Sequence, residues 1–294
     1  HQWRTAIFGG ETGGFGILKA DGSRTKRLES IELTKKEIDI IIPVLSSHRL
    51  NPKAAVAYLR SSDVQTYQEQ GPPRVIAGQW EQVRAELGHT HGLDSCQGAC
   101  QILWNYYNPC AFIFERHLES NLLPYEIILV PNPYVMKKEH AHRLKEFVSN
   151  GGTCVIESRF AVKNEHGALH ENSILEDLLG LECDHIETID DRISIPKIRN
   201  YAYGFRELIS NASNVLFEYD DGYPAFIEKK IGKGRILYAT FSLFMSVGKT
   251  GNNRILDFVR AWLPEPEYFI KNKENIELIV WEDGDTPILY VINH

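Results

Sequence analysis

The stretch PYEIILVPNPYVMKKEHAHRLKEFVSNGGTCVIESRF, residues 124–160, restricts the possible folds more than any other part of the chain. Its two apolar runs, EIILVP and TCVIES, are typical of buried strands, and residues 137–150 between them have the spacing of an amphipathic helix. The glycine pair at 151–152 is expected to end that helix. The apolar residues expected to face inward are Ala141, Leu144, Phe147 and Val148. A strand–helix–strand unit of this kind predicts a parallel sheet.

The segments on either side extend the same pattern. AAVAYL (54–59) and AFIF (111–114) are predicted strands, and SCQGACQILWNYYNPC is a predicted helix broken at Asn108-Pro109. SILEDLLG is a short helix ended by glycine. Two alternating runs joined by Gly232-Lys233-Gly234 then predict a hairpin, and NNRILDFVRAWLPEPE an amphipathic helix. The predicted fold class is therefore α/β, with helices covering both faces of a parallel sheet.

The two ends of the chain do not continue this alternation of strands and helices. A glycine-rich segment opens the chain, and SRTKRLESIELTKKEIDIIIPVL follows as a predicted helix that ends near Pro43. Pro264 and Pro266 mark a domain boundary, after which IELIVWE, the turn DGD and ILYVI predict a small β segment. Because the chain starts at His1 without an initiator methionine and stops inside a strand-like run, we expect it to be part of a longer protein.

Charge and motifs exclude several function classes. The formal charge of −7 and the pI near 5.9 give no electrostatic reason to expect nucleic acid as a partner. No run of 18 apolar residues is present, so no membrane partner is expected. We expect a cytoplasmic location, with a periplasmic or secreted one left open because the N-terminus is uncertain.

No cofactor is expected: GGETGGFG lacks the flanking strand and helix of a dinucleotide motif, and SVGKTGNN lacks the first glycine of a phosphate loop.

The cysteines and histidines give only weak signals for a site. Five scattered cysteines argue against a disulfide framework, and Cys96 and Cys100 fit either buried thiols or two ligands of a soft metal. Cys154 lies inside a predicted strand, which favours a core thiol over a nucleophile. His89 and His91 fit zinc ligands or exposed loop residues. His140 and His142, two apart on a helix, are not expected to converge. No metal site is predicted.

Glu11 is the carboxylate with the strongest claim to a ligand. It lies in a glycine-rich, aromatic-flanked loop where backbone can approach a sugar closely, although a solvent-facing loop glutamate fits the same pattern. Glycoside cleavage needs two carboxylates on either side of the bond, and sequence spacing alone does not reveal such a pair.

Three segments together resemble the glycoside hydrolase family 42 β-galactosidases. QWRTAIFGGETGGFGILKADGSRTKRLESIE is similar to the last barrel strand and helix of that family. LLPYEIILVPNPYVMKKEHAHRLKEFVSNGGTCVIESRFAVKNEHGALHE is similar to its trimerisation domain, an α/β layer related to the class I glutamine amidotransferase fold. IEKKIGKGRILYATFS, the following helix and LYVINH are similar to its final hairpin and the opening of its C-terminal β domain.

The resemblance implies a domain plan and a set of roles. Residues 1–50 are expected to be the end of a (β/α)₈ barrel, 51–265 a trimerisation-type α/β domain with a flavodoxin-like or amidotransferase-like sheet, and 266–294 the start of a β domain. In the family two glutamates on earlier barrel strands do the chemistry, so no catalytic residue is expected within this chain. Glu11, Trp3 and Arg4 are the implied sugar contacts. No amide chemistry is implied.

We therefore expect the C-terminal part of a β-galactosidase-like glycoside hydrolase acting on β-galactosides. Its expected partners are two further copies of itself, in a homotrimer, and carbohydrate. Two other hypotheses remain: a non-catalytic, carbohydrate-associated oligomerisation protein, and a stand-alone amidase-like or sugar-binding enzyme using Glu11, His89 or Cys154.

Overall fold

The computed structural model describes residues 16–70, 91–120, 122, 124–250, 253–271, 276–282 and 286–293. The chain forms two compact units. One consists of His1–Asn51 with Val280–Leu289, and the other of Pro52–Ile279 with Tyr290–His294. No described helix is both long enough and apolar enough to cross a membrane.

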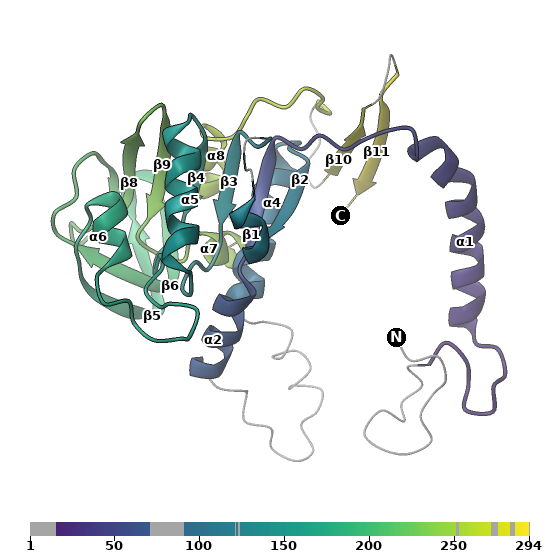
Figure 1. Cartoon of the computed structure of the whole chain (residues 1–294), viewed down its shortest axis with the longest axis horizontal. Coiled ribbons are helices and arrows are strands. Elements are labelled where there is room, and N and C mark those ends of the chain that lie inside the picture. The colour runs from purple at the N-terminus through teal and green to yellow at the C-terminus, as the bar shows by residue number, and fades with distance from the viewer. Residues whose placement is uncertain are drawn as a thin grey trace. The chain divides into compact units, whose positions relative to one another are not determined.

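The larger unit is built on a seven-stranded sheet in the order β2-β1-β3-β4-β9-β8-β7 (Figure 1). Neighbouring strands from β2 to β9 run parallel, whereas β8 and β7 are antiparallel additions. The strands are β1 (Ala54–Tyr58), β2 (Cys110–Phe114), β3 (Ile127–Val130), β4 (Thr153–Ile156), β7 (Val215–Glu218), β8 (Pro224–Ile231) and β9 (Gly234–Ala239). This confirms the predicted α/β class with a largely parallel sheet, and also the hairpin at Gly232.

Helices cover both faces of this sheet. Helices α5 and α6 pack on one face, while α4, α7 and α8 pack on the other (Figure 1). Successive residues of β3 alternate between the two sides, with Ile127 and Leu129 on the α4 side and Ile128 and Val130 on the α5 side. The helices of this unit are α2 (Arg60–Gln70), α4 (His91–Asn105), α5 (Lys138–Ser149), α6 (Ile174–Leu179), α7 (Leu243–Thr250) and α8 (Asn253–Arg260), with 3₁₀ turns η1 (Glu115–Glu119) and η2 (Pro196–Ile198).

The strand–helix–strand unit forms as predicted. The apolar face of α5 is buried through Ala141, Leu144, Phe147 and Val148, and the parallel strands β3 and β4 flank it in sequence. Asn150 caps the helix, and Gly151 follows with a φ of 119°, a left-handed conformation that glycine adopts without a Cβ penalty.

The analysis of the sequence missed α7 and a second, two-stranded sheet. Strands β5 (Cys183–Ile195) and β6 (Asn200–Ile209) pair in antiparallel fashion, with an irregularity between Ile189 and Ile193 that disturbs the alternation of polar and apolar residues. Strand β6 then contacts the segment after β9, where Glu207 N–H donates to Thr240 O (2.7 Å) and Ser242 N–H donates to Phe205 O (3.0 Å). The hairpin thereby covers the end of the main sheet at which its parallel strands finish.

The smaller unit contains α1 (Lys26–Leu45), whose first turn is capped by the Thr25 side chain. The helix continues through Pro43, so the predicted end was two residues early; a proline in the last turn removes only one intrahelical hydrogen bond. None of the described residues of α1 is buried. Near the other end of the chain, β10 (Ile276–Trp281) and β11 (Ile288–Asn293) form the predicted strand pair.

Candidate functional site

Open parallel sheets usually bind ligands beyond the carboxyl ends of their strands, and here part of that edge is filled by protein groups. We call these groups the carboxyl-edge network: Asn132, Glu157, Arg159, Glu207 and Tyr238. The Glu157 carboxylate accepts from the backbone N–H of Asn132 (2.5 Å), and the Glu207 carboxylate accepts from the backbone N–H of Arg159 (2.8 Å) and from Tyr238 Oη–H (2.5 Å). All five residues are buried. The five residues therefore form an internal polar core over this part of the edge.

Arg159 is the cationic residue of the carboxyl-edge network. Its guanidinium donates to Asn132 Oδ1 (3.0 Å) and stacks between two rings, 3.8 Å from the centre of Phe205 and 4.3 Å from that of Tyr134. Burial raises the pKa of both Glu157 and Glu207 to about 7, against the opposing influence of their hydrogen-bond donors and of the Arg159 charge. Burial also lowers the pKa of Arg159, to about 10, which still leaves it cationic at neutral pH.

The turn after β4 has a shape that could present a nucleophile, but the chain places an arginine there. Arg159 has a φ of 65°, a strained backbone of the type found where a strand turns sharply and exposes a catalytic serine or cysteine. The nearest cysteine, Cys154, is fully buried inside β4, and burial raises the pKa of its thiol well above the usual range. The strand–helix–strand unit thus has the features of a scaffold, as the spacing around Cys154 suggested.

A small cavity of about 200 Å³ lies beyond the ends of β1, β2 and β3. Its polar groups are already engaged: the Glu115 carboxylate accepts from Ser61 N–H (2.8 Å), and His140 Nε2 lies 3.2 Å from the Glu119 carboxylate. His142, two residues along α5, is exposed and lies 3.8 Å from Asp177, so the two histidines do not converge, as predicted.

The cysteines form a cluster that the sequence did not reveal. The thiol of Cys100 on α4 has two other thiols as neighbours, that of Cys110 at the start of β2 and that of Cys96 one helical turn earlier on α4. These contacts and burial raise the pKa of the Cys100 thiol. Within the described ranges no set of three or more metal-binding side chains is arranged to hold an ion. Cys96 and Cys100 are buried, and Cys110 is partly buried.

Four of the residues proposed from sequence cannot be placed. Trp3, Arg4, Glu11 and His89 lie outside the described residues. His91 is described, and it is buried in α4 with its ring against that of Phe205, the centres 5.3 Å apart. It is a packing residue there.

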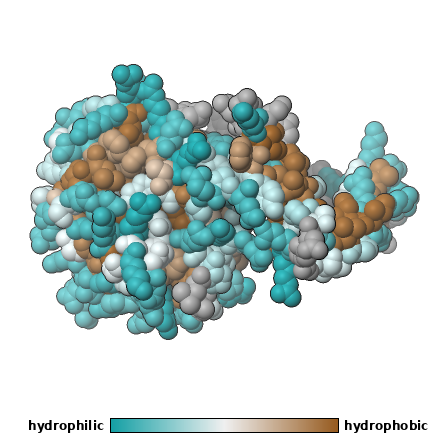
Figure 2. Space-filling view, turned by 90° about the horizontal axis from the view of Figure 1, so that it is seen from above, coloured by the Kyte–Doolittle hydropathy of each residue, from teal (hydrophilic) through white to brown (hydrophobic). Residues whose placement is uncertain are grey.

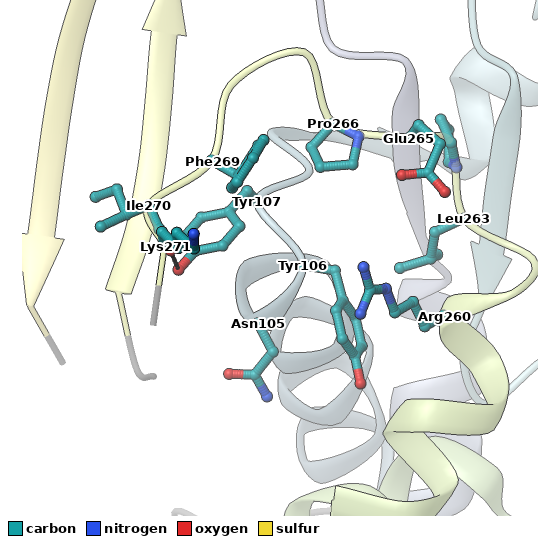
Figure 3. A pocket seen from close by; sticks show the side chains of 11 residues that line it. Asn105, Tyr106, Tyr107, Arg260, Leu263, Glu265, Pro266, Phe269, Ile270 and Lys271 are labelled. Atoms are coloured by element: carbon teal, nitrogen blue, oxygen red, sulfur yellow. Dashed lines mark hydrogen bonds between the residues drawn. The ribbon is translucent and has the colours of Figure 1, made fainter. Parts of the chain in front are cut away.

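A cleft of about 930 Å³ lies in the larger unit, and we call it the aromatic cleft (Figure 3). It is formed by the end of α4 and the turn after it, by the end of α8, and by the extended segment 263–271. Its walls combine three aromatic rings with amide, carboxylate, guanidinium and ammonium groups, from residues Asn105, Tyr106, Tyr107, Arg260, Glu265, Phe269 and Lys271. The prediction for this region was a helix broken at Asn108-Pro109 and a domain boundary at Pro264 and Pro266, without a site. The available signal was Tyr107, a bulky residue at a helix end where glycine is usual.

Comparison with known proteins gives the family. Residues 115–263, half of the chain, match the family model of the β-galactosidase trimerisation domain of glycoside hydrolase family 42. The chain belongs to this family. Its α5, β4, β9 and α8 all lie within the matched trimerisation domain, and the resemblance seen in the sequence is thereby confirmed.

Several β-galactosidases match this chain over almost its whole length, beyond the trimerisation domain. β-Galactosidase BgaA of Clostridium cellulovorans is 23% identical over 308 residues, an alignment that covers 100% of this chain and 43% of BgaA. A catalytic mutant of Gan42B, a family 42 β-galactosidase from G. stearothermophilus, has a TM-score of 0.71 at 18% identity, covering 99% of this chain and 42% of Gan42B. The β-galactosidase from Bacillus circulans sp. alkalophilus gives 0.70 at 18% identity, with 100% and 43% covered. The chain thus spans less than half the length of these relatives and shares their fold.

Proposed function

We propose that this chain is the trimer-forming, C-terminal part of a β-galactosidase-like glycoside hydrolase that acts on β-galactosides. The observation that carries the proposal is the trimerisation-domain match, which covers the larger unit from η1 to the end of α8. The carboxyl-edge network supports it, because buried side chains of this chain occupy part of the edge at which such sheets usually bind ligands.

The proposed fold type of the sheet is flavodoxin-like, with the class I glutamine amidotransferase fold as its relative. The strand order β2-β1-β3-β4-β9 supports this, since renumbering the parallel strands along the chain gives 2-1-3-4-5, the order of the flavodoxin-like doubly wound sheet. The domain plan is likewise a proposal: 1–50 as the end of a barrel, 51–265 as the trimerisation-type domain and 266–294 as the start of a β domain.

The edge strand β2 is our proposed site of contact between subunits. Among the described strands only β1 pairs with β2, so one side of β2 has free backbone groups. Phe112 and Phe114, on the same face, are 47% and 41% exposed, whereas Ile113 between them is buried. In the space-filling view hydrophobic residues reach the surface at several places among hydrophilic ones (Figure 2). Exposed aromatic residues on an open edge strand favour a protein partner.

Light scattering of the purified chain tests this assembly. We expect a mass of three times the 33.6 kDa chain, independent of concentration. Because a closed trimer uses one patch against a different patch, introducing charge on one side breaks all three contacts. The double substitution Phe112→Glu with Phe114→Glu is therefore expected to give monomers with an unchanged circular dichroism spectrum.

Leu169→Glu is the matched control, because Leu169 is 68% exposed and is not part of β2. It is expected to leave the trimer intact. A wild-type monomer would refute self-association by this part of the enzyme, and a trimer that survives both glutamates would refute the choice of β2.

We further propose that Glu11, Trp3 and Arg4 contact the sugar, and that the catalytic glutamates are supplied by barrel strands other than those in this chain. The two fully buried carboxylates, Glu157 and Glu207, support this, because neither is open to a substrate. The purified chain is accordingly expected to show no turnover of an aryl β-galactoside above the uncatalysed rate. Measurable turnover lost on Glu11→Gln would instead make Glu11 a catalytic residue.

A further inference from the structure

The aromatic cleft has a residue with a strained, left-handed backbone in its wall. Helix α4 ends in a Schellman motif, in which Asn108 N–H donates to Leu103 O (3.0 Å) and Tyr107 N–H donates to Trp104 O (3.1 Å). Tyr107 occupies the left-handed position of this motif with a φ of 56°. Glycine is the usual residue there, and a bulky side chain is disfavoured. Strain of this kind in the wall of a cleft is a reason to look for a ligand.

The tyrosine is also held in place. Its hydroxyl donates to Ile270 O (2.8 Å), which ties the turn after α4 to the extended segment 263–271. Phe269, 65% exposed, lies next to it at the mouth of the cleft (Figure 3). Below them Tyr106 donates to Asp257 Oδ1 (3.1 Å), so its ring is fixed as well. Two rings are therefore preorganised, which lowers the entropy lost when a ligand binds.

The polar groups of the cleft favour a neutral ligand over an ion. Helices α4 and α8 both end here, at Asn105 and Arg260, and the C-terminal ends of helices carry partial negative charge that disfavours anions. Arg260 and Lys271 offset that charge and disfavour cations, and Glu265 brings the fixed charges close to balance. No carboxylate in the described ranges lies within ion-pair distance of Arg260, whose guanidinium lies over the ring of Tyr106, 5.4 Å from its centre.

We propose that the aromatic cleft is a binding site for a neutral saccharide. A sugar ring presents an apolar C–H face, which fits flat aromatic rings, and an edge of hydroxyl groups that both donate and accept hydrogen bonds. Tyr107 and Phe269 offer the rings, and Asn105, Glu265 and Arg260 offer acceptors and donors at the rim. At about 930 Å³ the cleft lies within the range of about 300–1,000 Å³ typical of ligand pockets. All its residues belong to the larger unit.

Titration of the isotope-labelled 294-residue chain with lactose, followed by amide NMR, tests the site. Saturable shifts are expected at residues 105–107 and 263–271, with a dissociation constant in the millimolar range. Phe269→Ala removes one exposed ring without touching the core, and is expected to weaken binding about five- to tenfold. Tyr107→Gly, which relieves the backbone strain, is expected to fold normally and also to weaken binding.

Two controls distinguish a saccharide site in the cleft from a general effect of removing a ring and from anion binding. Tyr223→Ala, which removes an exposed ring outside both the cleft and the proposed subunit contact, is expected to leave lactose binding unchanged. Inorganic phosphate is expected to cause no shifts at the cleft. The proposal is overturned if lactose gives no saturable shifts, if Phe269→Ala binds lactose as tightly as the wild type, or if phosphate binds and lactose does not. The scattering mass is measured independently, so failure here leaves the trimer proposal standing, and the reverse also holds.

Discussion

Replacing Arg159 by methionine is expected to lower the free energy of unfolding by about 3–5 kcal/mol at pH 8, the cost of removing one partner from a buried charge network. At pH 5 the loss is expected to be much smaller. Methionine has a similar length and fills the space between Phe205 and Tyr134, so the change removes mainly the charge and the hydrogen bond to Asn132. What remains is two buried carboxyl groups without a compensating cation.

The pH dependence follows from the raised pKa of Glu157 and Glu207. Each has a folded-state pKa of about 7, above the ordinary value of 4.5 that applies to the unfolded chain. Below about pH 4.5 both states are protonated and the full stability is present. As the pH rises towards 7, the unfolded chain releases these protons more readily than the native protein, so the free energy of unfolding falls. Without Arg159 the folded-state pKa values are expected to rise further, so this loss extends to higher pH.

Urea unfolding at both pH values measures the effect. Arg235→Met is the matched control, since that guanidinium stacks on the ring of Trp262 (4.3 Å) and no buried carboxylate among the described groups depends on it. A small loss, equal at pH 5 and pH 8, is expected for the control. If Arg159→Met were equally destabilising at both pH values, the charge network would not be the cause. Glu207→Gln is expected to reduce the decline of wild-type stability between the two pH values.

Gly234→Ala is expected to destabilise the protein by about 3 kcal/mol or more, at the upper end of overpacking effects. A Cβ at this position would lie 2.2 Å from Gly152 O and 2.2 Å from Val148 O, and both of these are backbone atoms that cannot rotate away. The start of β9 would have to move away from the end of α5, which loosens a buried part of the sheet.

Gly180→Ala separates this steric effect from a conformational one. Gly180 ends α6 with a φ of 62° and nothing lies within 4 Å of its added Cβ, so only the left-handed backbone is penalised, by about 1–2 kcal/mol. Denaturant midpoints of the two variants give the comparison. Equal losses would mean that the helix end and the hairpin adapt to the extra methyl group at position 234.

Much of the larger unit could be predicted because its elements have strong local patterns. The apolar face of α5 and the run of β3 are periodic, and Gly232-Lys233-Gly234 marks the hairpin. Strands β5 and β6 lacked such a signal, since the irregularity near Ile189 interrupts the alternation. Helix α7 was missed because its residues 243–250 follow strand β9 closely, with only Thr240, Phe241 and Ser242 between them.

The same difference between local and long-range features applies to the candidate site. Sequence spacing was enough to predict that Cys154 is a core thiol and that His140 and His142 diverge, because both conclusions depend on neighbours along one element. The carboxyl-edge network and the aromatic cleft join residues far apart in the chain, such as Arg159 with Glu207 and Tyr107 with Ile270. Local periodicity along the sequence determined the α/β class. These long-range contacts form only in the tertiary structure, because the burial and the left-handed backbone angles on which they depend arise there.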